Sequence, residues 1–336
     1  MIRVSIAGVT GFTGEELLKI LVRHPEVQIK HLISRQAGQK ISDTHPSVLF
    51  DGETENLSVN IISDTDVVFL CLPHTESASA AYRFYERGKA VIDLSADFRF
   101  RNATNYRNVY GVAHPYPRLL SKAVYGLSEF YREKIKGAKL LANPGCYPTA
   151  SLFAILPALM SGISSENGIV IDAKSGISGA GKKLAEEYLF SSVYGSTRAY
   201  SVGCHRHQPE IEQEILLITG KKPTLSFVPH LLPQERGIMA TVYMRMKEII
   251  REEAVLTAYR KFYKNERFVK VLPPGSMPAT GDVSGTNNVR IGIAVDRRAG
   301  TLIVISVIDN LIKGASGQAV QNMNIMFGFE ESTALK

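Results

Sequence analysis

The first residues of the chain place an apolar strand, a glycine turn and an amphipathic helix in direct succession. Residues 1–7 are strand-forming, Gly8–Gly14 reads Gly-x-x-Gly-x-x-Gly, and residues 15–23 carry Leu and Val at helical spacing. His24-Pro25 ends the helix, and residues 28–34 form the next strand. Parallel strands joined by a crossover helix require a sheet that is covered by helices on both faces. This opening therefore restricts the N-terminal part to a doubly wound α/β fold.

The alternation continues and then changes. Residues 66–71, 90–94 and 140–142 are further strands, with a helix at 76–87. Later β-type runs follow one another with fewer helices, at 168–173, 224–230, 238–247, 289–295 and 301–308. We therefore predict a Rossmann-type parallel-sheet domain at 1–145 and a mixed α+β domain with a largely antiparallel sheet at 146–308. A helix over Asp309–Phe327 is expected to pack back on the first domain, and residues 309–336 form this C-terminal segment.

The composition fits a globular protein of two domains, with 336 residues, 45% hydrophobic and 21% charged. The net charge of +7 is scattered and does not interleave with aromatic residues, so we predict no nucleic-acid partner. An anionic ligand or an acidic partner protein also suits this charge.

The first residues are not a secretory leader, and the longest apolar runs, such as 152–160, are too short to span a membrane. Three widely spaced cysteines favour a reduced, cytoplasmic protein.

The glycine turn has the position that a dinucleotide site requires. Its glycines let the backbone approach a pyrophosphate, and the following helix start supplies N–H groups. The predicted contacts are Gly8, Thr10, Gly11, Phe12, Thr13 and Gly14. The second strand ends in Ser34-Arg35 without the carboxylate that usually binds the NAD ribose, and a cation there suits a 2′-phosphate. The sequence therefore predicts NADP, with an exposed loop arginine as the alternative interpretation of Arg35.

One cysteine is placed for chemistry, in Asn143-Pro144-Gly145-Cys146-Tyr147-Pro148-Thr149. Gly145 permits a sharp turn, Pro148 suits the first helical position, and the helix is expected to continue over 149–156. Cys146 then lies beside a helix N-terminus, where the dipole favours the thiolate. The thiol is a candidate nucleophile for a carbonyl carbon, and Asn143 is a candidate substrate contact. The alternative is an inert cysteine, which is our interpretation of Cys71 in its apolar strand.

An acid–base group is predicted in Cys204-His205-Arg206-His207-Gln208-Pro209-Glu210. One of the two histidines would transfer the proton, Glu210 would orient it, and Arg206 would contact the substrate. A metal site from Cys204, His205 and His207 lacks a fourth ligand at a recognisable spacing, and we predict no metal. Surface histidines on a polar loop are a further alternative.

Two other segments can bind anions. Arg99 follows a strand end of the first domain and can hold a phosphate or carboxylate. The small residues of 175–181 offer N–H groups for an anion or for close cofactor approach. The alternative interpretation of this segment is a flexible loop.

Several motifs together resemble one family over nearly the whole chain. They are the glycine turn, Leu72-Pro73-His74, Gly126-Leu127-Ser128-Glu129, the Cys146 motif, Ser175–Gly181, His205–Ile211, Pro229-His230-Leu231-x-Pro233 and Gly314–Ala319. This set resembles the N-acetyl-γ-glutamyl-phosphate reductases, which often have Pro where Ser128 stands here. The resemblance implies a fold like that of glyceraldehyde-3-phosphate dehydrogenase and NADPH-dependent reduction of an acyl phosphate in arginine biosynthesis. It also implies a homo-oligomer, dimer or tetramer.

The resemblance assigns roles residue by residue. The nucleophile maps to Cys146, the active-site histidine to His205 or His207, and Glu210 belongs to the same motif. The implied cofactor contacts are the glycine turn, Ser34, Arg35, Pro73, Ser175, Gly176 and Asn310.

Three alternatives stay open at this point. A lysine-pathway reductase of a carrier-bound aminoadipate phosphate would suit the basic surface, although Pro209-Glu210-Ile211 favours the acetylglutamate enzyme. Aspartate-semialdehyde dehydrogenase shares the fold and chemistry but lacks the double-histidine motif. A non-catalytic NADP sensor would not need a cysteine at a helix start.

Overall fold

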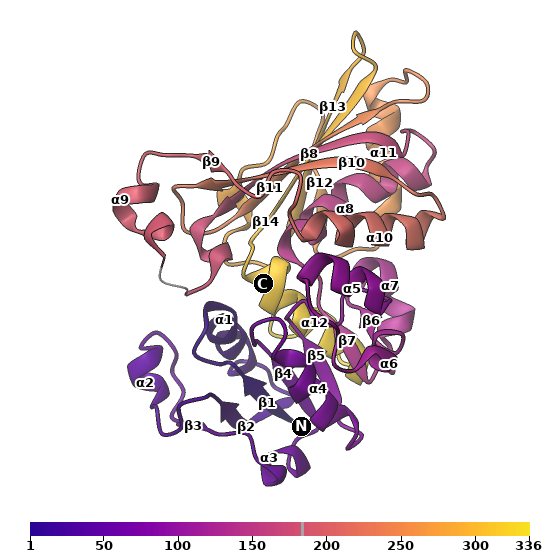
Figure 1. Ribbon diagram of the computed structural model, residues 1–336. Coiled ribbons are helices and arrows are strands. Elements are labelled where there is room, and N and C mark those ends of the chain that lie inside the picture. The colour runs from indigo at the N-terminus through magenta and orange to yellow at the C-terminus, as the bar shows by residue number, and fades with distance from the viewer. Residues whose placement is uncertain (183–184) are drawn as a thin grey trace. The chain divides into compact units, whose positions relative to one another are not determined.

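The computed structural model describes residues 1–182 and 185–336, which form two compact units, each with its own sheet (Figure 1). Unit 1 comprises Met1–Gly145 and Ala315–Lys336, and unit 2 comprises Cys146–Gly314. Among the described residues, no helix is both long enough and apolar enough to cross a membrane.

Unit 1 contains a sheet of seven parallel strands in the order β3-β2-β1-β4-β5-β7-β6. Their bounds are β1 (Ile2–Ala7), β2 (Val27–Ile33), β3 (Thr54–Glu55), β4 (Val67–Leu70), β5 (Ala90–Asp93), β6 (Val124–Tyr125) and β7 (Leu140–Ala142). Ala7 at the end of β1 pairs with Ile33 of β2 and with Leu70 of β4. The strand order therefore reverses at β1, which is where ligands bind in open parallel sheets. The predicted Rossmann-type sheet is confirmed.

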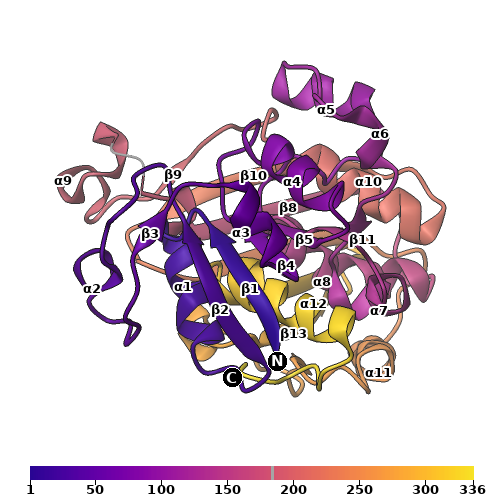
Figure 2. The same cartoon turned by 90° about the horizontal axis from the view of Figure 1, so that it is seen from below.

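Helices cover both faces of this sheet. They are α1 (Phe12–Leu21), α2 (Ile41–Thr44), α3 (Val59–Ser63), α4 (Ser77–Tyr85), α5 (Ala103–Tyr110), α6 (Pro117–Leu120), α7 (Ser128–Ile135) and α12 (Gly317–Phe327). On one face, Val68 and Leu70 of β4 join Phe84 of α4 in a buried apolar cluster. Figure 2 shows β1 and β2 side by side, with α1 and α12 next to each other.

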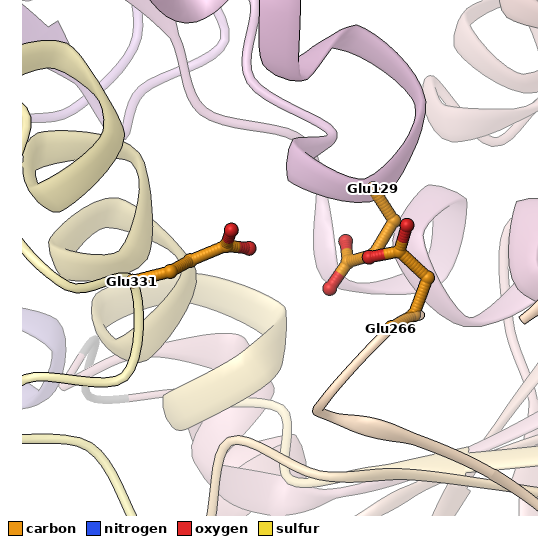
Figure 3. A group of neighbouring side chains, drawn as sticks. All are labelled: Glu129, Glu266 and Glu331. Atoms are coloured by element: carbon orange, nitrogen blue, oxygen red, sulfur yellow. The ribbon is translucent and has the colours of Figure 1, made fainter. Parts of the chain in front are cut away.

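The C-terminal helix α12 is attached to unit 1 by polar contacts. The Ser128 hydroxyl, at the point where the family often has Pro, donates to Asn322 at 2.8 Å. The amide of Gln321 donates to Glu129 and to Glu331, and Glu331 also pairs with Arg132 at 2.9 Å. Figure 3 shows the side chains of Glu129 and Glu331. Glu266, labelled in the same figure, belongs to unit 2.

The continuous helix expected over 309–327 is wrong in its first part. β14 ends at Ile308, a π-helix occupies Ile312–Ser316, and α12 begins at Gly317. The cause is the buried carboxylate of Asp309, whose Oδ1 accepts the N–H groups of Leu311 at 2.8 Å and Ile312 at 3.1 Å. These bonds turn the chain sharply where a regular helix would have run on.

Unit 2 contains a seven-stranded sheet in the order β12-β13-β14-β11-β8-β10-β9. The strands are β8 (Asn167–Gly176), β9 (Arg198–Ala199), β10 (Thr224–Leu232), β11 (Ile238–Arg245), β12 (Val269–Val271), β13 (Val289–Asp296) and β14 (Thr301–Ile308). β10 runs parallel to β8 and β12 parallel to β13, and the other neighbours are antiparallel. The predicted mixed, largely antiparallel sheet is confirmed.

The longest helix of unit 2, α8 (Cys146–Met160), is buried almost throughout and packs on β11 and β14. Pro157 has no N–H for the carbonyl of Phe153, and the hydroxyl of Tyr263 donates to that carbonyl at 2.7 Å instead. Tyr263 follows α11 (Glu252–Phe262), so a second helix supplies the missing donor.

The start of α8 differs from the sequence-based prediction. The helix begins at Cys146, so Pro148 occupies its third position instead of its first. Proline is tolerated there because the N–H groups of a first helical turn have no helical acceptor.

Candidate active site

The glycine turn of unit 1 is shaped so that side chains do not fit. Gly8 has φ +82°, and a Cβ on it would lie 2.3 Å from the carbonyl oxygen of Cys71. A Cβ on Gly14 would lie 2.6 Å from Cα of Val9. Gly11 is the N-cap residue of α1 and offers no capping side chain, and Phe12 and Thr13 are the first helical residues. The predicted contacts, Thr10 among them, thus form a backbone cradle at a helix start, which fits a pyrophosphate.

The corner after β2 carries the two residues predicted to select the cofactor. Asn56 donates its amide to the carbonyls of Ser34 and Arg35 at 3.1 Å each, which fixes the corner. The exposed guanidinium of Arg35 pairs with Glu76, which raises the pKa of Arg35. A phosphate at this corner would compete with Glu76 for the guanidinium.

The turn that contains Pro73 is held by a buried carboxylate. Thr75 has φ +74°, and its N–H donates to Asp97 at 2.7 Å. The other carboxylate oxygen of Asp97 accepts the N–H of Ala78 in α4 at 2.9 Å. Asp97 therefore orients its neighbours.

Arg99 and Asn143, both predicted substrate contacts, are tied into unit 1 by hydrogen bonds. The buried guanidinium of Arg99 donates to the carbonyl of Asn143 at 2.9 Å and to that of Leu94 at 3.1 Å. The amide of Asn143 donates to the carbonyl of Ala315 at 3.1 Å and accepts from Asn322 at 3.2 Å. These contacts connect the ends of β5 and β7, and they engage polar atoms that a substrate would otherwise meet.

In unit 2, Cys146 is the first residue of α8. The ring of the next residue, Tyr147, packs against both predicted histidines. The ring of Tyr147 meets His205 at 5.8 Å, His207 at 5.9 Å and Phe227 at 5.3 Å between centroids. The rings of His205 and His207 lie 4.8 Å apart. Packing against Tyr147 therefore brings both histidines to the start of the helix that carries the thiol.

A second phenol completes this aromatic group. The hydroxyl of Tyr200 donates to that of Tyr147 at 3.1 Å. Burial raises the pKa of Tyr200 to about 12, and the nearby sulfur of Cys146 adds to the shift. Both phenols are therefore neutral hydrogen-bonding groups at physiological pH.

His205 is held in one neutral form. Burial, together with the charge of Arg206, lowers the pKa of His205 to about 4. Its Nδ1 accepts the backbone N–H of His207 at 3.1 Å. A neutral imidazole carries one hydrogen, so the hydrogen lies on Nε2, and that atom is a donor.

The other members of the motif lie at the start of α10 (His207–Thr219). Arg206 is its N-cap residue, and His207 is its first helical residue. Glu210 is fully buried in the first turn, where the helix dipole stabilises a carboxylate.

A pocket of ≈570 Å³ opens beside these residues within unit 2. Its lining is Gly179, Ala180, Glu187, Tyr188, Arg198, Tyr200, Ser201, Cys204, His205, Arg206, His207 and Leu231. Two guanidinium groups and two imidazoles in one polar pocket suit an anionic small molecule. In the described part of the chain, Cys71, Cys146 and Cys204 form no disulfide.

The glycine-rich loop after β8 is used by the protein itself. The N–H groups of Gly176, Ile177 and Ser178 donate to the carbonyls of Gly237, Gln234 and Glu235 at 2.9–3.1 Å. The hydroxyl of Ser175 donates to the carbonyl of Gly176 at 2.9 Å. These three N–H groups are therefore not available to an anion.

Asn310 links the same two loops. Its Oδ1 accepts the N–H of Gly237 at 2.8 Å, and its Nδ2 donates to the hydroxyl of Ser178 at 2.9 Å. It thus fixes the shape of the segment that contains Ser175 and Gly176.

Sequence reasoning missed Tyr200 and Phe227 as parts of the site. Neither lies in a recognisable motif, and both join the site only through packing around Tyr147.

Comparison with known proteins follows the same division into two parts. Residues 3–138 match the family model of the semialdehyde dehydrogenase NAD binding domain, and residues 146–310 match that of the semialdehyde dehydrogenase dimerisation domain. The N-acetyl-γ-glutamyl-phosphate reductase of Moorella thermoacetica is 47% identical over 100% of this chain and 98% of its own length. The reductase of Geobacter sulfurreducens is 45% identical over the same shares.

The chain belongs to the N-acetyl-γ-glutamyl-phosphate reductase family. This confirms the resemblance, and the relatives do not favour the lysine-pathway or sensor alternatives. Unit 1 is accordingly the nicotinamide-cofactor domain of a reductase, which its glycine cradle fits.

Solved structures show the same fold at low identity. The aspartate semialdehyde dehydrogenase II of Vibrio cholerae superposes on this reductase-family chain with a TM-score of 0.75 at 19% identity, over 97% of this chain and 98% of that one. The NADP complex of the Candida albicans aspartate semialdehyde dehydrogenase gives a TM-score of 0.70 at 16% identity, over 97% and 98%.

Proposed function

We propose that this protein reduces N-acetyl-γ-glutamyl phosphate to N-acetylglutamate 5-semialdehyde with NADPH and releases phosphate, a step of arginine biosynthesis. The observation that carries the proposal is the position of Cys146 at the head of α8, with both histidines packed around the adjacent Tyr147. Full-length relatives at 44–47% identity carry the name of this activity.

The thiolate of Cys146 attacks the acyl carbon, the bond from carbon to the phosphate oxygen breaks, and inorganic phosphate leaves. The acyl group stays on the sulfur as a thioester. When bound, the nicotinamide supplies a hydride equivalent, two electrons, to the thioester carbonyl carbon. Breaking the bond from carbon to sulfur then releases the aldehyde and returns the thiolate.

His205 acts in this scheme as a hydrogen-bond donor. Its Nδ1 accepts the N–H of His207, so the ring hydrogen lies on Nε2, and Nε2–H is the donor. Such a donor stabilises the negative oxygen that develops as the tetrahedral adducts form. His207 and Glu210, both at the start of α10, remain to move the proton.

The cofactor is NADPH in this proposal, held by the glycine cradle and by the corner at Ser34 and Arg35. The guanidinium of Arg35 would exchange its partner Glu76 for the 2′-phosphate. Arg206 and Arg198, which line the pocket, are the candidates for the substrate's anionic groups. The protein is placed in the cytoplasm, where thiols such as Cys146 stay reduced.

A homo-oligomer belongs to the same proposal. α8 packs against one face of the unit 2 sheet, the face that carries the buried Ile171 and Val242, and the alternate residues of these strands, on the opposite face, are partly exposed. These side chains include Val170, Met239, Tyr243, Ile303 and Ile305. A second copy packing on this face would bury them, and the matching family model is a dimerisation domain. Tyr243→Asp is expected to lower the molar mass in sedimentation equilibrium, and an unchanged mass would exclude this face.

The test of the activity is NADP⁺ reduction in the reverse direction with phosphate present. We expect turnover with N-acetylglutamate semialdehyde, at least about 100-fold slower turnover with aspartate semialdehyde, and slower turnover with NAD⁺ than with NADP⁺. Cys146→Ser should lose at least about 1,000-fold in kcat and keep its NADP⁺ affinity. Full activity of Cys146→Ser would rule out the covalent route.

A further inference from the structure

Gly314 has no room for a side chain, because an added Cβ would meet Cys146 and, at 3.3 Å, the carbonyl oxygen of Asp309. A Cβ added to Gly314 would lie 2.8 Å from Cβ and 3.3 Å from Cα of Cys146. Neither atom is the far end of a flexible side chain, so neither can rotate away. The backbone of Gly314 therefore lies directly against the root of the thiol side chain.

An unusual turn brings Gly314 to this position. Its N–H donates to the carbonyl of Asp309 at 2.9 Å, a hydrogen bond between residues five apart. The buried carboxylate of Asp309 accepts the N–H groups of Leu311 and Gly285 at 2.8 Å each, which fixes the start of the turn. Single π-helical turns are rare and are frequent at functional sites.

The two contacting residues are also the first and the last residue of unit 2. The chain thus enters and leaves this unit at one place, and the thiol projects from that place. A displaced Cβ of Cys146 would turn Sγ away from the direction set by the start of α8.

We propose that Gly314 is a positioning residue that fixes Cβ of Cys146, and therefore Sγ, at the start of α8. The inference rests on the proposed function only in that Cys146 is the nucleophile. A regular helix from Asp309 would place a different backbone segment against the thiol. The π-turn is therefore required for the contact between Gly314 and Cys146.

The test is Gly314→Ala in the full chain, with Gly281→Ala as the matched control. Gly281 also lies in unit 2, and a Cβ on it would meet nothing within 4 Å. Alkylation of Cys146 by iodoacetamide is followed by peptide mass mapping from pH 5 to 9, with the exposed Cys204 as internal standard. We expect Gly314→Ala to slow alkylation of Cys146 about 10-fold and to shift its pH profile, since sulfur and helix start are no longer aligned. The rate at Cys204 and the affinity for NADP⁺ should not change.

In turnover, Gly314→Ala should lower kcat/KM by about 10- to 100-fold, and Gly281→Ala should not. A wild-type alkylation profile in folded Gly314→Ala would overturn the proposal. If that variant does not fold, Asp309→Asn weakens the turn without adding volume, and its Cys146 profile must shift in the same direction. The alkylation readout needs no substrate, so it holds even if the acyl substrate differs from the one proposed.

Discussion

Unit 1 buries a carboxyl group at the end of β5, whereas unit 2 holds a half-buried imidazole, that of His205, close to the start of α8. Burial raises the pKa of Asp93 to about 6, and the charge of Asp97 adds to the rise against hydrogen bonds from Ser77 and Ser95. Burial also lowers the pKa of His205 to about 4. In both units the desolvated group is pushed toward its neutral form.

The same physical effect has opposite consequences for stability. The folded-state pKa of Asp93 lies above its unfolded value of about 3.9, so its stabilisation is full below pH ~4 and is lost as pH rises through ~6. The folded-state pKa of His205 lies below ~6.5, so its stabilisation is present above that pH and is lost as pH falls through ~4. The comparison teaches that desolvation shifts both groups toward their neutral forms and that the two shifts make stability depend on pH in opposite directions.

The largest expected effect comes from replacing the neutral donor of unit 2. His205→Asn places no donor where Nε2–H stands and should lower kcat/KM by at least about 100-fold. His205→Gln can present an amide N–H near that point and should lose only about 10-fold. Steady-state rates of the two variants check this, together with the pH profile.

The pH profile also tests the protonation state of His205. Because its pKa lies at about 4, the wild-type activity should not fall between pH 7.5 and 5.5 through protonation of this residue. Equal losses in His205→Asn and His205→Gln would mean that the imidazole transfers a proton, and the donor role would then be wrong.

Many features of the two units could be predicted because neighbouring residues in the sequence encode them. The cradle at Gly8–Gly14 and the thiol of Cys146 are each encoded by neighbouring residues, because a turn and a helix start are local structures. The parallel and mixed sheets also followed from the order of strand-forming and helix-forming runs.

The features that could not be predicted from the sequence depend on tertiary packing. Tyr200 reaches the site only by its hydroxyl contact with Tyr147, and Gly314 only by the turn that Asp309 caps. The sequence placed a continuous helix at Asp309, because nothing in its pattern shows that this carboxylate is buried. The hydrogen bonds that engage Arg99 and Asn143 within unit 1 were hidden for the same reason.

The smaller effect lies in unit 1 and concerns stability alone. Asp93 accepts the hydroxyls of Ser77 at 2.6 Å and Ser95 at 2.8 Å, and asparagine keeps one acceptor for them. Because asparagine carries no charge, Asp93→Asn removes the proton uptake that links folding to pH at this site. The slope of unfolding free energy against pH between 4 and 6 should therefore change by at most about 1.4 kcal/mol per pH unit.

Urea unfolding of Asp93→Asn and wild type at pH 4, 5, 6 and 7 measures this slope. The contributions of the other carboxylates cancel when the unfolding free energy of wild type is subtracted from that of the variant. The free energy of unfolding of the variant should increase relative to that of wild type as pH rises, because only wild type must keep an ionised group buried at neutral pH. Ser77→Ala serves as the matched control, because it removes one hydrogen bond to Asp93 and leaves the charge. A constant difference across the four pH values would show that Asp93 ionises in unit 1 as easily as in water, and the symmetry between the two buried groups would be lost.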